Sequence, residues 1–549
     1  MKAFVRLAAV TLAAGCAPLP EGRYEGLGHH TRAISTRSPA AQAWFDQGLN
    51  FLFAFNHDEA IRSFERAAAL DPECAMAWWG ISFAHGPHIN NPALPPERAR
   101  EAWKALTRAR ELAPKADPVE RDLIEALGRR YADPPPEDRA PLDQAFAEAM
   151  GALRKKYPAD ADIGALAAEA LMDVHPWDLY TSDGQPKEWT GPIVRLLEEV
   201  LAQSPNHPLA LHLYIHAVEA SSDPGRAVAA ADRLRDLTPG LGHLVHMPSH
   251  IDVRVGTWEK GAKANLRAIA ADDAYVARSK PPGFYRIYMS HNRHMLAFIS
   301  MMRGQSAQAT RAGRELVEAM PEAWLREYAA IADGFLATPY ELHIRFGRWN
   351  EMLAEPEPLE MFPLSRALWR YARAVSLAAL KRTVEARAEQ KAFLEARARV
   401  PKEASLGNNS AADLLAVAEA ALEGEILYRE GKAEPAFAAL REAVRREDAL
   451  RYDEPPDWIQ PIRHVLGAAL LHAGRAAEAE TVYRDDLARW PENGWSLLGL
   501  SRSLRAQGKD ARDVERRFRE AWKDADIEAT SSCLCLPLTK GADAAPAPR

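Results

Sequence analysis

The chain is patterned as a long series of amphipathic helices. Alanine, leucine, arginine and glutamate, which all favour helices, dominate the composition. Valine, isoleucine and threonine do not gather in alternating runs, so no β-sheet is predicted. Glycines such as Gly256, Gly304 and Gly431, each followed by an alanine five or six residues later, mark tight turns between two helices. The pattern predicts an all-α protein of about ten helix pairs across residues 41–527.

The first and last helix pairs carry a specific repeat signature. Residues 41–74 contain, in order, Trp44, Gly48, Phe51, Ala60, Phe64, Ala67 and Pro72. Residues 461–491 contain Leu466, Gly467, Leu470, Gly474, Ala479, Tyr483, Leu487 and Pro491, and residues 494–527 continue in the same register. This order and spacing resembles the tetratricopeptide-repeat superfamily over most of the chain. The resemblance implies an α-solenoid, or superhelix, in which each helix pair buries its apolar face against the next.

The regularity of the repeats divides the chain into segments. Residues 115–207 are the least regular, because they contain a proline-rich break at 132–136 and a long connector at 175–188. Loops inserted into solenoids often lie over a binding face. The expected segments are a signal peptide (1–15), a polar tether (16–40), N-terminal repeats with inserted loops (41–207), histidine-rich repeats (208–323), C-terminal repeats (324–527) and a tail (528–549).

The central repeats concentrate histidines on single helix faces. Residues three, four and seven apart share one face of an α-helix. Three stripes have this spacing: His212, His216 and Glu219; His243, His246 and His250; and His291 and His294. In the register of tetratricopeptide repeats, set from the turn glycines, all eight residues fall on the concave side, although only about four in 14 positions of such a helix do so. We therefore expect a groove lined with histidines.

Imidazole donors on adjacent helices suit a transition metal, and we predict a bound ion, zinc or copper, in this groove. The expected ligands are His212, His216, His243, His246, His250, His291 and His294. Glu219 and Glu169 are candidate general bases if the metal keeps a position open. Three alternatives remain: neutral histidines bonded to one another and to water, acid–base groups without metal, and a metal-free scaffold that binds a peptide or protein. Elemental analysis distinguishes these possibilities.

Several other residues are candidates for the groove or its ends. They are Asp173 and His175, near the end of the helix that precedes the histidine-rich repeats, and His85 and His88, in a loop rich in glycine, proline and asparagine. Trp458, Arg463 and His464 lie around the start of a helix expected near residue 461, which also faces the groove. For His85 and His88 the alternative is a plain surface loop. The aromatic and acidic loop at 452–458, which precedes that late helix, either closes one end of the cavity or packs a repeat junction. Cys533 and Cys535 are too close in sequence for a disulfide to be predicted, and either a soft-metal site or an unpaired solvent-facing motif fits them.

Charge and the N-terminus bear on partners and location. The net charge of −7 gives no support for a nucleic-acid partner. Lys2 and Arg6 precede a short apolar run that ends in small residues before Cys16. This resembles a bacterial lipoprotein signal and implies that Cys16 is lipidated, with Ala17 favouring the outer membrane. We expect an envelope protein that faces the periplasm and contacts the membrane through its lipid, since no later run approaches the roughly 20 apolar residues of a membrane span.

Overall fold

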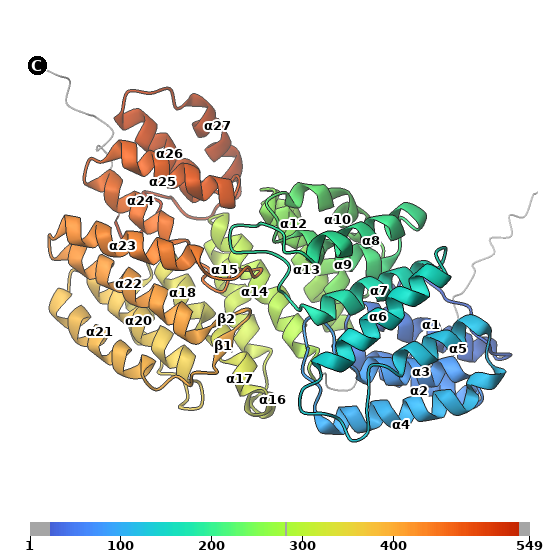
Figure 1. Ribbon diagram of the computed structural model, residues 1–549. Helices are drawn as coiled ribbons and strands as arrows, with labels where there is room; N and C mark the ends of the chain where they lie inside the picture. The colour runs from blue at the N-terminus through green and yellow to red at the C-terminus, as the bar shows by residue number, and fades with distance from the viewer. Residues whose placement is uncertain (1–21, 280–282, 537–549) are drawn as a thin grey trace, which may run out of the picture.

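A computed structural model describes residues 22–279 and 283–536, and α-helices account for most of them (Figure 1). Consecutive helices pack against each other along the chain, so the predicted all-α solenoid of helix pairs is confirmed. The described residues also hold a two-stranded antiparallel hairpin, β1 (Ser405–Leu406) and β2 (Asn409–Ser410), which is too short to show as an alternating pattern. None of the described helices has both the length and the apolar character to cross a bilayer.

The N-terminal helices form consecutive stacked pairs (Figure 1). They are α1 (Pro39–Phe53), α2 (His57–Leu70), α3 (Ala75–His85), α4 (Pro96–Leu112), α5 (Pro118–Leu127), α6 (Ala140–Lys156), α7 (Ala161–Val174) and α8 (Thr190–Gln203). Ser38, Asn56 and Asp160 cap the first turns of α1, α2 and α7, each accepting a hydrogen bond from a backbone N–H of the helix that it begins.

The central helices carry the histidines. They are α9 (Pro208–Val218), α10 (Val228–Leu234), α11 (Gly242–His246), α12 (Pro248–Arg254), α13 (Trp258–Val276), α14 (Arg286–Met302) and α15 (Ser306–Glu318). The second stripe is divided between α11 and α12 by Pro248, which begins α12. Proline removes a backbone donor and crowds the preceding turn, so a break at this position follows from its chemistry.

The C-terminal helices continue the pairing. They are α16 (Glu322–Glu327), α17 (Ala329–Ala332), α18 (Thr338–Arg345), α19 (Trp349–Ala354), α20 (Pro363–Ala379), α21 (Thr383–Arg397), α22 (Ala411–Arg429), α23 (Ala433–Asp448), α24 (Ile462–His472), α25 (Ala476–Arg489), α26 (Gly494–Ala506) and α27 (Arg512–Ala521). Short 3₁₀ turns lie between α4 and α5 (Ala113–Lys115), between α9 and α10 (Pro224–Ala227) and between α17 and α18 (Gly334–Ala337).

Small residues of the repeat signature let neighbouring pairs approach closely. The Tyr483 ring of α25 is fully buried between Gly467 of α24 and Gly499 of α26. A Cβ atom at Gly467 would lie 2.5 Å from this ring, and one at Gly499 would lie 2.1 Å from it. The glycines of the repeat therefore make room for the aromatic residue of the intervening helix. This contact packs one helix pair closely against the next.

This packing predicts opposite effects for two glycine-to-alanine substitutions. Gly499→Ala should destabilise the protein by about 1–3 kcal/mol, because the added methyl collides with a ring that has no room to move. Gly151→Ala in α6 should stabilise it by about 0.5–1 kcal/mol, because no atom lies within 4 Å of the new methyl and alanine favours a helix interior. Urea unfolding of the two variants checks both signs, and equal shifts would contradict the packing argument.

The two terminal segments that the structure describes lie against the helices. Arg32 of the expected tether forms ion pairs with Asp160 and Asp162 at the start of α7. Ser532 of the expected tail donates to the backbone carbonyl of His464 and bonds Tyr483. Residues 22–38 and 528–536 are thus parts of the folded body. The predicted signal peptide and Cys16 lie outside the described residues.

Contacts distant in sequence bring the C-terminal helices to the central ones. The Trp258 indole on α13 donates to the Pro491 carbonyl at 2.8 Å, and the Trp495 indole on α26 donates to the Met301 carbonyl at 2.9 Å. Arg451, in the loop between α23 and α24, donates to the Trp177 carbonyl at 3.0 Å. This loop therefore reaches from the C-terminal helices to the segment between α7 and α8, next to the histidine stripes.

Candidate metal centre

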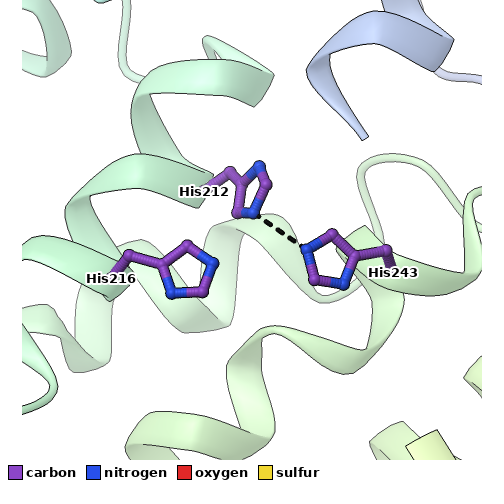
Figure 2. Close-up of side chains that lie close together, drawn as sticks. All are labelled: His212, His216 and His243. Atoms are coloured by element: carbon purple, nitrogen blue, oxygen red, sulfur yellow. Dashed lines mark hydrogen bonds between the residues drawn. The ribbon is translucent and has the colours of Figure 1, made fainter. Parts of the chain in front are cut away.

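Six of the seven predicted histidine ligands gather into two triads, in which every member is buried except the half-buried His291. His212 and His216 of α9 meet His243 of α11 in a first triad (Figure 2). His246 of α11, His250 of α12 and His291 of α14 make a second triad. Within each triad, one nitrogen atom of every ring lies within 4.8 Å of the other two. The stripes on three successive repeats therefore do converge, as the groove register predicted.

In the first triad the Nε2 atoms are turned toward each other. His212 Nε2 lies 3.1 Å from His243 Nε2, and its Nδ1–H donates to the Phe53 carbonyl at 2.9 Å. His216 Nδ1–H donates to Glu219 Oε1 at 2.8 Å. The Nε2 atom of His216 is buried and has no hydrogen-bond partner among the described residues. Outer acceptors thus hold two of the rings with an Nε2 lone pair pointing into the triad.

The second triad repeats this arrangement. His246 Nε2 lies 2.7 Å from His250 Nε2, which lies 3.5 Å from His291 Nε2. His246 Nδ1–H donates to Asn265 Oδ1 at 2.7 Å. The Asn265 amide is oriented for this role because its Nδ2 group donates to the Gly261 carbonyl. Donors bound to one tetrahedral ion at about 2.0–2.1 Å would lie about 3.3 Å apart, close to the spacings seen here.

Glu219 joins the two triads. One carboxylate oxygen accepts from His216 of the first triad, and the other accepts from His250 Nδ1–H of the second. Burial acts to raise the pKa of Glu219, but His250 and His216 lower it to about 2. Burial acts to lower the pKa of His250, yet the charge and hydrogen bond of Glu219 outweigh it and raise that pKa. Glu219 is therefore a permanent anion shared by both triads.

The hydrogen bonds leave the second triad in need of a cation. The Nδ1 atoms of His246 and His250 both face acceptors, so both carry protons. In neutral rings the two Nε2 atoms are then bare lone pairs only 2.7 Å apart. Such a contact is repulsive unless a proton or a metal ion lies between the nitrogens. Burial lowers the pKa values of the other ligands, His212, His216, His243, His246 and His291, which keeps them neutral as metal donors.

Both triads border one cavity. It has a volume of about 830 Å³, and His216 and His243 of the first triad and His250 and His291 of the second line it. Three protein donors with an open side facing a cavity is the arrangement of catalytic rather than structural metal sites.

His294, the seventh predicted ligand, lies apart from both triads. It is buried on α14 with its ring 5.3 Å from the Phe335 ring. Burial lowers the pKa of His294 to about 4. Its position makes it a matched control for the triad histidines.

The lowered pKa of His294 predicts a pH dependence of stability. Between pH 6.5 and 4 the unfolded chain binds a proton at His294 that the folded chain does not, so stability falls on acidification through this window and levels off below it. His294→Phe should remove about 3 kcal/mol of that fall while keeping a ring against Phe335. Urea unfolding at pH 7 and at pH 4 checks this expectation, and an unchanged fall in the variant would contradict it.

Glu169, the other predicted base, lies beside a different charge cluster. Burial, with the neighbouring charge of Asp173, raises the pKa of Glu169 to about 8. Burial also raises the pKa of Asp173 to about 7. Asp173 forms an ion pair with Arg130, whose side chain is fully buried. Asp173 therefore compensates a buried arginine, and Glu169 belongs to this cluster rather than to the triads.

The loop candidates take various positions near the cavity. His88 is buried with its ring 4.4 Å from the rings of His57 and Phe55, while the following residues 89–93 line the cavity. Burial lowers the pKa of His85 to about 4. His175 stacks on Trp189 at 3.9 Å and lines a separate cavity of about 360 Å³.

The C-terminal candidates belong to helix packing. Trp458 is buried 5.5 Å from the Tyr371 ring, and Arg463 forms an ion pair with Asp448. His464 is buried between Asp486 and Arg345.

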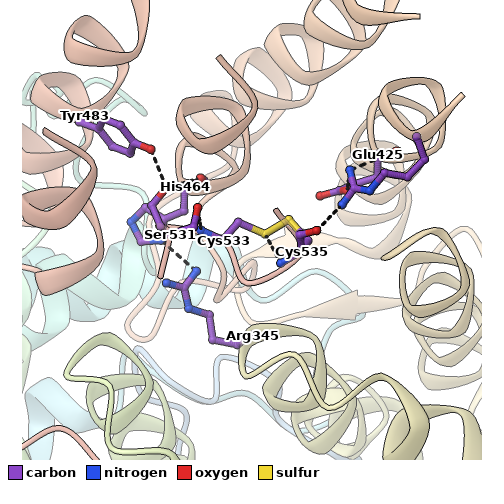
Figure 3. The surroundings of a disulfide bond; sticks show 9 residues. Arg345, Glu425, His464, Tyr483, Ser531, Cys533 and Cys535 are labelled. Carbon is purple, nitrogen blue, oxygen red and sulfur yellow. Dashed lines mark hydrogen bonds and ion pairs between the residues drawn. A yellow bond between two sulfur atoms is a disulfide. The ribbon is translucent and has the colours of Figure 1, made fainter. Parts of the chain in front are cut away.

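Cys533 and Cys535 are buried and joined by a disulfide, so the unpaired solvent-facing alternative is wrong (Figure 3). Arg429 donates to the Cys535 carbonyl.

Two groups at the site carry no signal in the sequence, and others carry only a partial one. Asn265 on α13 and the Phe53 carbonyl act from helices other than those of the rings they orient. Asp453 and Glu454 line the cavity from the loop before α24. Tyr288 also lines the cavity. It lies three residues before His291 on the same helix face, and this spacing is its only indication in the sequence.

A further cluster, His30, Asp162 and His207, joins the N-terminal segment to α7 and α9. It was not predicted, because its three members come from separate parts of the chain.

Comparisons with known proteins find only solved structures of low similarity. No family model and no curated protein matches the chain. Among solved structures, a human IFIT1 dimer with m7Gppp-AAAA aligns over 89% of this chain and 92% of its own, with 11% identity and a TM-score of 0.35. Yeast Tom70 aligns over 87% and 96%, with 14% identity and a TM-score of 0.33. At these scores the similarities have no bearing on what this chain binds.

Proposed function

We propose that the protein binds two transition-metal ions, zinc or copper, one in each histidine triad. The contact between His246 Nε2 and His250 Nε2 at 2.7 Å carries the proposal, because both Nδ1 atoms already donate to acceptors. A shared proton would also relieve the repulsion in the second triad. The first triad favours a metal ion over a shared proton, because burial keeps His212, His216 and His243 neutral. In addition, the buried Nε2 atom of His216 has no other partner among the described residues.

The open side of each triad supports a role in metal-assisted chemistry. A bound ion there would supply a Lewis acid at the cavity surface. The low pKa and double hydrogen bond of Glu219 suit it to orienting ligands rather than to accepting a proton from a substrate. Glu454 lines the cavity, and burial raises its pKa to about 8, so we assign any proton transfer at this site to Glu454 rather than to Glu219 or Glu169.

Elemental analysis of the full chain tests the proposal. After chelation and reloading with zinc or copper, the wild type should hold two ions, and His243→Ala and His246→Ala should each hold one. His294→Phe is the control and should hold two, because its ring lies beside Phe335 rather than in a triad. Circular dichroism verifies that each variant is folded. Fewer than two ions in the wild type, or equal losses in all three variants, would overturn the proposal.

We also propose that Cys16 is lipidated and holds the protein at the outer membrane, facing the periplasm. The basic start, the short apolar run and the small residues before Cys16 support this. Mass spectrometry of protein purified from a bacterial host tests it. The expected product begins at Cys16 and carries acyl chains, and Cys16→Ser should abolish them. A wild-type chain that begins elsewhere or lacks acyl chains would contradict the proposal.

A further inference from the structure

The cavity beside the triads is large enough for a small molecule and is walled mainly by apolar side chains. Its volume of about 830 Å³ falls within the range of small-molecule sites. Apolar residues from well-separated segments of the chain line it, among them Ile89, Trp177, Tyr288, Phe335 and Leu364. Histidines of both triads form another part of its surface, so a ligand here would contact apolar walls and the metal centre together.

Trp177 is held as a fixed aromatic wall. Its backbone adopts φ 57°, a left-handed conformation that a bulky residue rarely takes. Its indole N–H donates to Asn90 Oδ1 at 3.1 Å, and its carbonyl accepts from Arg451 at 3.0 Å. The ring then stands edge-on to His216, with centroids 5.1 Å apart. A strained backbone conformation of this kind persists only where the surrounding contacts hold the residue in place. Such residues are common at ligand sites.

The charges at the cavity surface disfavour an anionic ligand. Among the described residues that line it there is no lysine or arginine, whereas Asp333, Glu403, Asp453 and Glu454 are present. A phosphate or carboxylate would have no cationic side chain to pair with and would meet these acidic groups.

A cationic ligand is disfavoured for different reasons. Asp333 is occupied by the backbone N–H groups of Leu364 and Ser365 at the start of α20. Burial raises the pKa of Glu454 to about 8, so this group is mostly neutral at pH 7. Asp453 likewise accepts from the backbone N–H groups of Asn408 and Glu454, and Glu403 is exposed. The two metal ions of the proposed function, on which this step rests, would repel a cation and attract an anion beside the triads only, and the apolar walls offer neither of them a partner. These walls therefore favour an uncharged ligand.

We propose that this cavity binds an uncharged aromatic molecule, with a hydroxyl group directed at the metal centre and its ring between Trp177, Tyr288 and Phe335. The aromatic walls supply stacking and edge contacts to a flat ring. The hydroxyl is the polar group that lies at the open sides of the triads without bringing a charge into the apolar part of the cavity.

Three probes that share one ring system test the proposal by calorimetry. 2-Naphthol is uncharged at pH 7, 2-naphthoate is an anion and 2-naphthylmethylammonium is a cation. Chelated full-length protein should bind 2-naphthol at least about tenfold more tightly than either charged probe, a difference of about 1.4 kcal/mol, and loading with metal should not weaken its binding of 2-naphthol. Ala330→Trp places a large ring at an exposed position of the cavity wall on α17 and should reduce 2-naphthol binding about tenfold or more. Ala323→Trp, at an exposed position on α16, is the matched control and should bind like wild type.

Metal content measured on the same samples separates the two proposals. If the ions bind but either charged probe binds the chelated protein as tightly as 2-naphthol, or Ala330→Trp binds like wild type, the cavity proposal is overturned and the metal proposal stands. If 2-naphthol binds selectively to a protein that takes up no metal, the metal proposal fails and the cavity proposal is supported.

Discussion

Replacing Glu219 with glutamine is expected to weaken metal binding at both triads at once, by about 10- to 100-fold at each. The Glu219 carboxylate accepts the Nδ1–H of His216 from the first triad and that of His250 from the second. A glutamine side chain has one acceptor oxygen and no charge, so it cannot hold both rings in their ligand orientation. Competition with a chromophoric chelator measures the affinity of each ion in the variant and the wild type.

A substitution that affects one triad alone is the control for Glu219→Gln. Asn265→Ala removes only the acceptor that orients His246, so it should weaken the second ion and leave the first unchanged. The bridging role of Glu219 is wrong if Glu219→Gln leaves either ion within about twofold of its wild-type affinity. It is also wrong if both substitutions weaken the same single ion.

The histidine faces could be predicted because a helical period and a repeat register decide them locally. The spacings of His243, His246 and His250 put them on one helix face, and the turn glycines place that face toward the concave side. The division into two triads could not be predicted. It depends on how α9, α11, α12 and α14 are offset against each other, and the orienting groups Asn265 and Phe53 lie 19 and 159 residues from the rings they hold.

Predictions from the repeat register also fail where the repeat departs from its ideal geometry. His294 has the same expected register as the ligands, yet the turn before α18 brings Phe335 next to its ring. Asp453 and Glu454 lie in a loop without helical periodicity, so the sequence left two possibilities open, closure of one end of the cavity and the packing of a repeat junction, and could not decide between them. Their contribution comes from the approach of the C-terminal helices to the central ones, which is a property of the whole superhelix.

Replacing Asp486 with asparagine is expected to lower the free energy of unfolding by about 3–5 kcal/mol while both metal ions remain bound. Asp486 is buried on α25 and accepts from His464 Nε2 at 3.0 Å, from Ser496 Oγ at 2.7 Å and from Asn493 Nδ2 at 3.0 Å. Burial acts to raise the pKa of Asp486, but His464 and these hydrogen bonds lower it, so the group is an anion at neutral pH.

The loss follows from the groups that the Asp486 anion compensates. Arg345 is buried, lies 3.3 Å from His464 Nδ1 and stacks on Trp495. Without the anion, this cation has no nearby counter-charge, because asparagine can accept the same hydrogen bonds but carries no negative charge. Asp485→Asn, on the exposed side of the same helix, is the control and should change stability by no more than about 0.5 kcal/mol. Urea unfolding and elemental analysis of both variants decide the role of His464. Equal stabilities of the two variants would mean that the buried network around Asp486 contributes nothing. Loss of a metal ion from Asp486→Asn would indicate that His464 belongs to the metal centre after all.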